Sequence, residues 1–425
     1  MGLKVLIVDD DDIAGGLSRD LLKDAGMDAE LITNSLKAID TLREMRPDMA
    51  VLDILMPGID GLSLCHKIKT DPELRFIKVV MVSGKSFEAD KQRARQYGAD
   101  LFIEKPYNIE SFASQIAEVG GRKDKTAETP AAPASVPQMK SGADAALQIA
   151  IYGARGIPGQ KTPTSSAYGL KTSCVTIDAG DRKFIFDAGT GIVQLGAELA
   201  LSGAKEIFLF LTHFHPDHTR GLGEFQPLHT AGCSIHISAG KEPDRPLQDL
   251  VTEALEATLP AGASVEAEIQ LHELFEQVYE VCPGVNLTSF YANHPGTTLG
   301  FVVQANDRKV VFCPDSELYG EGATALQDYD DRLARIAQGA DLIIHDGRYT
   351  AEDYRTIKNS GHSSFVSAVH MAGKAGAKRL LIFHMDSQYP DDVLDRMGVE
   401  AARVAAERGY KLEVALAREG LKIGV

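Results

Sequence analysis

The segment Glu206-Ile-Phe-Leu-Phe-Leu-Thr-His-Phe-His-Pro-Asp-His218 decides the fold of the larger part of this 425-residue chain. Its first half is an apolar run with the length of a buried strand. Its second half places His213 and His215 two residues apart, so an extended backbone directs both imidazoles to the same side. Asp217 and His218 follow where the chain is expected to turn into a helix. Imidazole and carboxylate ligands favour Zn²⁺, Fe or Mn²⁺ over Ca²⁺.

This segment holds more ligand-type residues than one metal takes from a single loop, so it predicts two metals side by side. Three further candidates lie downstream, two of them at the ends of apolar segments. They are His294 in Asn293-His-Pro-Gly296, Asp315 at the end of residues 310–315 and His384 at the end of residues 380–384. A lone histidine at a strand end is more often a packed residue than a ligand. Together with the first segment, however, the three indicate a metal centre.

Strand patterns dominate the chain from Leu147 to Val425. Strands are expected at residues 148–153, 173–177, 183–187, 206–212, 234–238, 299–303, 309–313, 342–345, 379–384 and 411–415. Residues 240–285 are acidic and their pattern predicts helix, as in residues 248–256. A further helix is expected over residues 394–408.

The first 120 residues alternate short apolar strands with helical patterns. Strands are expected at residues 4–10, 27–33, 49–55, 78–83 and 100–104. Such alternation predicts a parallel, doubly wound (βα)5 sheet, in which ligands sit at the carboxyl ends of the strands. The residues expected at those ends are Asp9, Asp10, Asp53, Ser83 and Lys105. Carboxylates gathered at one edge repel one another unless a cation joins them, and oxygen-only ligation suits Mg²⁺.

Between these two parts the composition changes. Residues 124–137 hold three prolines and much alanine without a hydrophobic period, which is typical of a semi-extended linker. The predicted organisation is therefore a first domain over residues 1–122, a linker over residues 123–145 and a second domain over residues 146–425.

The overall composition limits the partners and the compartment. A formal net charge of −16 disfavours binding to long nucleic acid, which needs clustered Lys and Arg. No apolar run approaches about 18 residues, so no membrane span is expected. The opening Lys4-Val-Leu-Ile-Val8 is a strand pattern rather than a secretory signal. Five scattered cysteines without a C-x-x-C pair favour a reducing cytoplasm.

The strand-end residues of the first part also carry a family resemblance. The Asp9-Asp10 pair, Asp53 in Val51-Leu-Asp-Ile-Leu-Met-Pro-Gly58, Ser83, and Lys105 in Glu104-Lys-Pro106 make residues 4–119 resemble a response-regulator receiver domain. The resemblance implies that Asp53 is the phosphoacceptor, that Lys105 pairs with the phosphoryl group, that Ser83 binds it on activation and that Phe102 moves with that change. It implies that Mg²⁺ is held by Asp9, Asp10, Asp53 and the carbonyl of Leu55. A sensor histidine kinase would be the phosphodonor, and the resemblance also allows a homodimer.

The His-x-His-x-Asp-His motif makes residues 147–425 resemble the metallo-β-lactamase-fold hydrolases, an αββα sandwich. The resemblance implies one metal bound by His213, His215 and His294, a second metal bound by Asp217, His218 and His384, and Asp315 as the bridging ligand. The metals would be Zn, Mn or Fe. Two metals at about 3.5–4 Å separation would activate a bridging water and clamp the attacked centre.

Two later segments are similar to the tRNase Z-like phosphodiesterase branch of that family. They are Ile344-His-Asp-Gly-Arg-Tyr-Thr350 and Ser360-Gly-His-Ser-Ser364. By this resemblance His362 would act near the leaving oxygen, with Asp346 as its orienting partner, so Asp217, His362 and Asp346 form the expected catalytic set. A His–carboxylate pair fits that role because the carboxylate fixes the tautomer. The basic arm that grips tRNA has no counterpart here, so a tRNA substrate is not expected.

The leading functional hypothesis is a cytoplasmic response regulator whose output is a metal-dependent phosphodiesterase acting on a small phosphodiester, such as a cyclic nucleotide, or on short nucleic acid. Two alternatives stay open. One is a hydrolase for a lactone, thioester or sulfate ester, since fold does not fix function. The other is a non-catalytic, metal-binding partner module under phosphorylation control.

Overall fold

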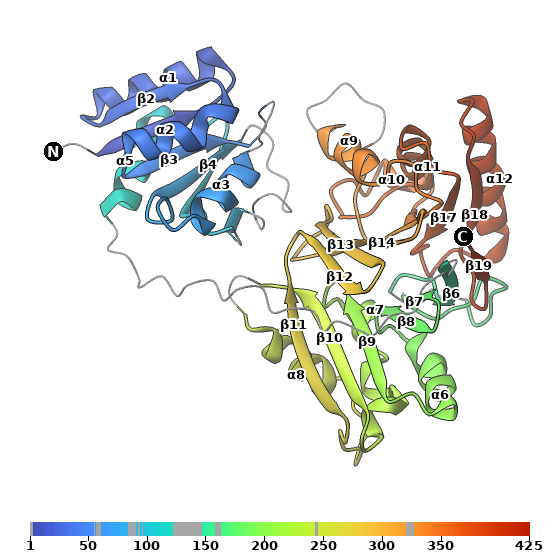
Figure 1. The fold of residues 1–425 in the computed structure, drawn as a ribbon. Coiled ribbons are helices and arrows are strands. Elements are labelled where there is room, and N and C mark those ends of the chain that lie inside the picture. The colour runs from blue at the N-terminus through green and yellow to red at the C-terminus, as the bar shows by residue number, and fades with distance from the viewer. Residues whose placement is uncertain are drawn as a thin grey trace. The chain divides into compact units, whose positions relative to one another are not determined.

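The computed structural model divides into two compact units, Met1–Ala131 and Ala132–Val425, which are described separately (Figure 1). The described residues are 3–54, 56, 61–83, 91, 94–95, 97–121, 147–157, 163–242, 245–319 and 327–425. The predicted linker, residues 123–145, lies outside them, so the domain boundaries stay predictions. No described helix is long and apolar enough to cross a membrane.

The first unit is a five-stranded parallel sheet in the order β2-β1-β3-β4-β5, with helices on both faces. Its strands are β1 (Lys4–Val8), β2 (Asp28–Ile32), β3 (Met49–Asp53), β4 (Lys78–Ser83) and β5 (Leu101–Glu104). Its helices are α1 (Asp12–Asp24), the short η1 (Ser35–Lys37), α2 (Ala38–Met45), α3 (Gly61–Thr70) and α5 (Ile109–Gly121). The doubly wound sheet predicted from the sequence is confirmed. The helix expected between β4 and β5 falls largely outside the described residues.

Alternate residues of the parallel strands build two cores. On β1, Val5 and Ile7 pack in the cluster that includes Phe112 of α5, whereas Leu6 and Val8 pack in the cluster that includes Leu42 of α2. All four β1 side chains are buried because helices cover both faces, which explains why the strand is an unbroken apolar run. The carboxyl ends of the strands are thereby held at one fixed edge.

The second unit contains two seven-stranded sheets. The first has the order β11-β10-β9-β8-β7-β6-β19 and the second has the order β12-β13-β14-β15-β16-β17-β18. The first sheet consists of β6 (Leu147–Gly153), β7 (Cys174–Ala179), β8 (Arg182–Phe186), β9 (Glu206–Leu211), β10 (Ser234–Gly240), β11 (Glu268–Leu274) and β19 (Lys422–Gly424). The second sheet consists of β12 (Val278–Cys282), β13 (Val285–Tyr291), β14 (Leu299–Ala305), β15 (Arg308–Cys313), β16 (Leu342–Asp346), β17 (Arg379–Phe383) and β18 (Glu413–Leu416).

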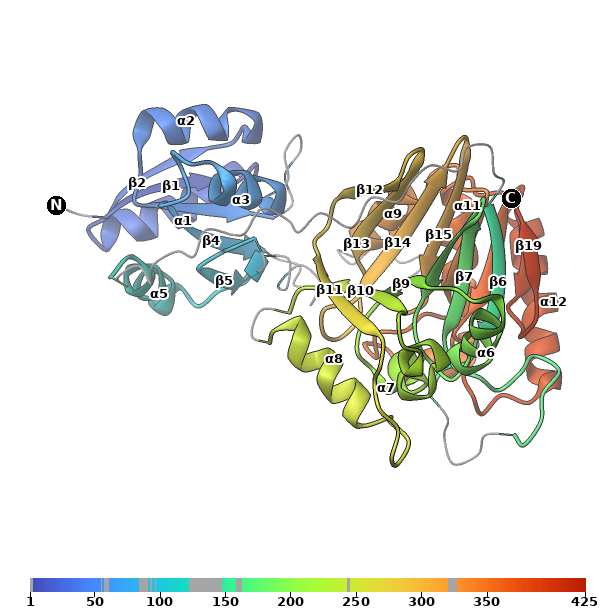
Figure 2. The ribbon, with the colours of Figure 1, turned by 60° about the horizontal axis from the view of Figure 1, so that its bottom comes forward.

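Helices cover the outer face of each sheet, as Figure 2 shows. Between strands of the first sheet the chain forms α6 (Ile192–Ser202), α7 (Pro216–Thr219), η2 (Leu222–Glu224), η3 (Gln226–His229) and α8 (Leu247–Glu256), of which α6 packs on β6 and α8 on β11. Between strands of the second sheet it forms α9 (Gln327–Ile336), α10 (Ala351–Tyr354), α11 (Phe365–Lys374) and α12 (Asp391–Glu407), of which α11 packs on β16 and β17 and α12 on β18. The result is the predicted αββα sandwich, which is confirmed.

Phenylalanine rings fill the space between the two sheets. Phe186 of β8 contacts Phe301 of β14 and Phe312 of β15 at centroid separations of 5.4 and 5.5 Å. Phe312 in turn meets Phe383 of β17 edge to face at 5.7 Å. These rings are fully buried, and such pairs add about 0.5–1.5 kcal/mol each beyond area burial. The core therefore fixes the loops that follow β8, β9, β15 and β17, where the candidate ligands lie.

One sequence prediction is wrong. Residues 240–285 were expected to be helical throughout, but only α8 is a helix, and β11 and β12 occupy residues 268–274 and 278–282. Both are the outermost strands of their sheets. An edge strand exposes one side of its backbone and many of its side chains, so β11 is mostly half-buried and lacks the apolar run of an inner strand. For this reason the acidic sequence of β11 was interpreted as part of a solvent-exposed helix.

Candidate functional site

The metal-ligand segment follows β9 and turns directly into α7. His215 has extended backbone angles, and Pro216 begins the helix, where its fixed φ suits the first turn. The Thr212 carbonyl accepts a hydrogen bond from the Leu299 N–H at 2.9 Å, so β14 holds the start of this segment. The geometry therefore brings strand-end and helix-start ligands to one place.

A first group of ligand atoms comes from His213, His215 and His294, all within 4.8 Å of one another. Nε2 of His294 lies 3.1 Å from Nδ1 of His215. Nε2 of His213 is buried and meets no hydrogen-bond partner among the described residues. A buried nitrogen without a partner is costly unless another group uses its lone pair. The three-histidine group predicted from the sequence is thus assembled in space.

A second group comes from Asp217, His218 and His384. Nε2 of His384 lies 3.0 Å from Asp217 Oδ2 and 3.3 Å from Nε2 of His218. All three residues are buried. The two ring nitrogens face each other, so a cation beside them would accept both lone pairs.

Asp315 joins the two groups. It follows β15, is 1% exposed, and its carboxylate belongs to one cluster with His213 and His218 and to another with Asp346, His362 and His384. Its Oδ2 is 2.7 Å from Nε2 of His218, and its Oδ1 is 3.3 Å from Nε2 of His384. Seven predicted ligands from four segments of the chain therefore meet at one buried centre that could hold metal.

The electrostatics of this centre suit metal binding. Burial lowers the pKa of His294 to about 3 and lowers the pKa of His213 well below its ordinary value, so both rings are neutral and keep a lone pair. Burial alone would raise the pKa of Asp315, but the imidazoles of His384 and His218 hold that pKa well below its usual range. Burial alone would lower the pKa of His218 and His384, but the neighbouring carboxylates raise both overall, so a metal bound there would displace protons. Imidazole nitrogens and ionised carboxylates bind Zn, Mn or Fe, so the donor set fits a divalent transition metal.

Hydrogen bonds orient the ligand rings from behind. Nδ1 of His218 donates to Asp187 at 2.7 Å, and Nδ1 of His294 donates to the Gly361 carbonyl at 2.7 Å, as assigned from the hydrogen-bond network. Both bonds leave Nε2 free to face the centre. Asp187 has φ +64° and His384 has φ +58°, conformations that non-glycine residues rarely adopt. Such strain concentrates at functional sites.

His362 and Asp346 lie beside the two groups. Nδ1 of His362 is 2.8 Å from Asp346 Oδ2 and 3.2 Å from Asp315 Oδ1. Burial lowers the pKa of His362 to about 3, and burial raises the pKa of Asp346 well above its ordinary value. Nε2 of His362 lies 3.2 Å from Nη1 of Arg348. The expected His–carboxylate pair is therefore formed, and a guanidinium faces its open nitrogen.

Three neighbours of the site were not singled out from the sequence: Asp187, Glu317 and Arg348. Glu317 is 2% exposed and accepts hydrogen bonds from the N–H groups of Asn359 and Gly361 at 2.7 and 2.8 Å. It thereby holds the loop that carries His362. Asp187 and Arg348 each follow an apolar strand. That position is the feature of the sequence that could have marked them as site residues.

The predicted receiver site lies at the carboxyl ends of β1, β3 and β5. Nζ of Lys105 is 2.8 Å from Asp9 Oδ2 and 2.9 Å from Asp53 Oδ1. These carboxylates, together with burial acting in the opposite direction, raise the pKa of Lys105 overall, so the ammonium stays charged. The predicted phosphoacceptor and the predicted lysine are therefore adjacent.

The other predicted receiver residues take different places. Ser83 ends β4 and is buried, and Phe102 on β5 is half-buried. Asp10 is exposed. Leu55, whose carbonyl was expected to bind Mg²⁺, lies outside the described residues.

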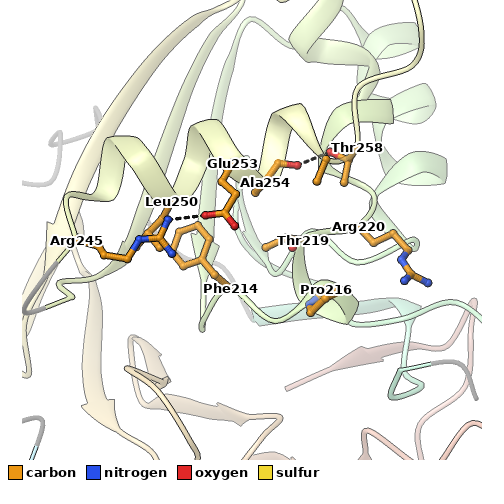
Figure 3. A pocket seen from close by; sticks show the side chains of 10 residues that line it. Phe214, Pro216, Thr219, Arg220, Arg245, Leu250, Glu253, Ala254 and Thr258 are labelled. Atoms are coloured by element: carbon orange, nitrogen blue, oxygen red, sulfur yellow. Dashed lines mark hydrogen bonds and ion pairs between the residues drawn. The ribbon is translucent and has the colours of Figure 1, made fainter.

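A separate cavity of about 380 Å³ lies between α7 and α8 (Figure 3). It is lined by Phe214, Pro216, Thr219, Arg220, Arg245, Leu250, Glu253, Ala254, Ala257 and Thr258. Arg245 and Glu253 form an ion pair at its wall. None of the predicted site residues lines it, so this cavity and the ligand cluster are different features.

Comparison with known proteins defines the class. Residues 5–117 match the response regulator receiver domain family, and residues 182–385 match the beta-lactamase superfamily domain. The chain belongs to the response-regulator receiver family, and it joins that domain to a metallo-β-lactamase-fold domain.

Particular relatives cover one part each. The chain is 36% identical over 116 residues to the polar-differentiation response regulator DivK of Brucella anthropi, which covers 27% of this chain and 94% of that protein. The metallo-beta-lactamase fold protein YhfI from Bacillus subtilis is similar at 18% identity and a TM-score of 0.49, over 66% of this chain and 100% of that one. A diphosphatase from the PhnP family is similar at 17% identity and a TM-score of 0.43, over 65% and 97%.

Proposed function

We propose that this response regulator carries a phosphodiesterase as its output domain, with two divalent metals at the buried His/Asp cluster. The observation that carries the proposal is the pair of ligand groups joined through Asp315, with the His362–Asp346 pair beside them. When bound, the metals would supply an activated water as nucleophile and neutralise charge on the phosphoryl group. Zn, Mn and Fe all suit this donor set.

The chain's own residues orient the reaction. Asp217, His218 and His384 would hold one metal and His213, His215 and His294 the other, with Asp315 shared between them. His218 and His294 each donate a hydrogen bond from Nδ1 to a fixed acceptor. Their rings are therefore already oriented with the Nε2 lone pair toward the centre. Such preorganisation lowers the cost of reaching the reactive geometry.

His362 would act on the departing oxygen. Nδ1 of His362 donates a hydrogen bond to Asp346, so Nε2 is the ring nitrogen available to substrate. Burial keeps the ring neutral at rest, with its proton on Nδ1, because burial lowers its pKa to about 3. The negative charge of a bound phosphodiester would raise that pKa, so Nε2 would take up a proton from solvent and pass it to the departing oxygen. A lactone or thioester would not provide that charge, which is why the phosphodiester is preferred over these two substrates.

The receiver domain would control this activity through Asp53. A sensor histidine kinase would provide the phosphoryl group, and Mg²⁺ bound near Asp9, Asp10 and Asp53 would assist its transfer. Lys105, already within 2.9 Å of Asp53, would pair with the phosphoryl group. Ser83 and Phe102 would report the change to the rest of the domain.

The substrate would be small. The net charge of −16 disfavours long nucleic acid, whereas a cyclic nucleotide or a short phosphodiester can be held by metals alone.

The test is hydrolysis of bis-p-nitrophenyl phosphate by the full chain loaded with Mn²⁺, Zn²⁺ or Fe²⁺. The proposal expects a metal-dependent rate that falls to background in Asp217→Ala and persists in Asp249→Ala, an exposed change on α8. Metal-loaded protein that shows no activity with any of the three metals would refute the proposal.

A further inference from the structure

Arg348 is an anchored arginine at the edge of the ligand cluster. It follows β16 by two residues, and its side chain is 13% exposed. Its Nε lies 3.3 Å from Asp386 Oδ2, and its backbone N–H donates to Asp346 at 2.9 Å. Tyr349 lies beneath the guanidinium, with 5.4 Å from the ring centroid to Cζ. The guanidinium is therefore held by an acid on one edge and by a ring on one face.

The acid that anchors it is itself fixed. Asp386 Oδ1 accepts the Gln388 N–H at 2.9 Å. The fully buried Arg155 donates to the carbonyls of Asp386 and Tyr389 at 3.2 and 2.9 Å. Arg348 consequently rests on a loop with little freedom to move, and little ordering entropy remains to be lost when it binds a ligand.

The free edge of the guanidinium faces the cluster. Nη1 lies 3.2 Å from His362 Nε2, while Nη2 has no hydrogen-bond partner among the described residues. The first side-chain atom of a residue placed at Gly156 would lie 3.2 Å from Nη1 and 3.0 Å from Cε1 of His384. The Arg348 guanidinium and the ring of His384, a candidate metal ligand, thus both lie next to Gly156.

We propose that Arg348 binds a non-bridging phosphoryl oxygen of the substrate, which makes this edge of the cluster an oxyanion-binding site. The inference rests on the proposed function and narrows its substrate class to esters with an anionic tetrahedral group. The carboxylates of Asp217 and Asp315 would repel such an anion, so a fixed cation beside the metals has a clear use. A planar guanidinium with open N–H groups matches a phosphoryl group, and a lysine does not replace it.

The anion would also replace His362 as the acceptor of the Nη1 hydrogen bond, without movement of Arg348. At rest Nη1 of Arg348 donates to Nε2 of His362, so that nitrogen is occupied. A phosphoryl oxygen that accepts the hydrogen bond from Nη1 leaves Nε2 of His362 open toward the ester. The competing interpretation is that Arg348 only ties the loop after β16 to the loop at Asp386.

The experiment measures binding of inorganic phosphate to the metal-loaded full chain by titration calorimetry, with metal content and the unfolding temperature recorded for each variant. Arg348→Met should weaken phosphate binding by about tenfold or more, since a charge-assisted hydrogen bond is lost. Arg348→Lys should fall between wild type and Arg348→Met. Arg355→Met, an exposed arginine nearby in sequence with the same charge change, should bind phosphate normally.

Two results of the binding experiment would overturn the inference. One is phosphate binding by Arg348→Met equal to that of wild type. The other is loss of metal or of fold in Arg348→Met together with phosphate, because Arg348 would then act as a structural tie. Phosphate binding through Arg348 without phosphodiester hydrolysis would leave this inference standing and refute the proposed function. Phosphodiester hydrolysis with an unchanged KM in Arg348→Met would support the proposed function and refute this inference.

Discussion

The carboxylate of Asp187 lies 2.7 Å from Nδ1 of His218, so a residue directly after β8 orients a candidate metal ligand of the loop after β9. Asp187 also accepts hydrogen bonds from the backbone and hydroxyl of Thr212, both at 2.9 Å. One buried carboxylate thereby fixes the ligand ring and the start of the ligand segment together.

Asp187→Asn should weaken metal binding by about 10–100-fold, the usual cost of losing a partner behind a ligand. Asparagine tolerates the positive φ at this position, so the backbone should persist. Competition with a fluorescent metal indicator measures the affinity. Asp178→Asn, on β7 of the same sheet, is the control and should bind metal as wild type does. Equal affinities in the two variants would contradict the orienting role.

Glu317→Gln should disorganise the loop that carries His362. Glu317 accepts the N–H groups of Asn359 and Gly361 on its two oxygens and the hydroxyl of Tyr354 at 2.8 Å, so an amide NH₂ would face a donor. We expect about 1–3 kcal/mol lower stability and a lower kcat for the phosphodiester. Chemical unfolding and steady-state kinetics measure the two effects, with exposed Glu352→Gln as the control. A fully active variant of normal stability would argue against this role.

Metal removal should destabilise the second unit selectively. Metal present at about 1,000 times its Kd adds about 4 kcal/mol to the stability of the unit that binds it. Scanning calorimetry with a transition-metal chelator, in Mg²⁺ throughout, should lower the unfolding temperature of that unit alone. In Asp217→Ala the second unit should already unfold at the lower temperature, and the chelator should not change that temperature. A chelator effect that is the same in wild type and in this variant would count against the assigned site.

The sequence predicted the parts of this molecule whose signal is local. The apolar runs of β1, β3 and β9 identify inner strands, and parallel connection brings their carboxyl ends together, so Asp9, Asp53 and Lys105 could be grouped without coordinates. The spacing of His213 and His215 likewise needs only an extended backbone.

The remainder depends on contacts between distant segments. Asp187 is an acid after a strand like many others, and its role appears only when β8 and β9 lie side by side. Arg348 is held in place by Asp386, which is 38 residues away in the sequence. β11 was missed because an edge strand buries too few side chains to show a period.

Asp53→Asn should abolish labelling of the receiver by phosphoramidate, because the asparagine amide cannot take a phosphoryl group. Gel electrophoresis that retards phosphoproteins measures the label, and Asp28→Asn, exposed on β2, should be labelled normally. The rate of phosphodiester hydrolysis should change on labelling in wild type and stay constant in Asp53→Asn. Labelling that persists in Asp53→Asn would place the phosphoacceptor elsewhere.

Asp341 should make the second unit sensitive to acid. Burial alone would raise its pKa, but Lys378 Nζ at 2.7 Å and the Lys309 N–H at 2.9 Å lower that pKa overall. A carboxyl whose pKa is depressed in the folded state stabilises that state above its unfolded pKa of about 3.9, and the stability is lost as the pH falls through the folded value. Asp341→Asn should therefore cost about 1–3 kcal/mol at neutral pH and progressively less below about pH 4. Urea unfolding across this range measures the difference against exposed Asp307→Asn. A gap that stays constant down to about pH 3 would contradict the assignment.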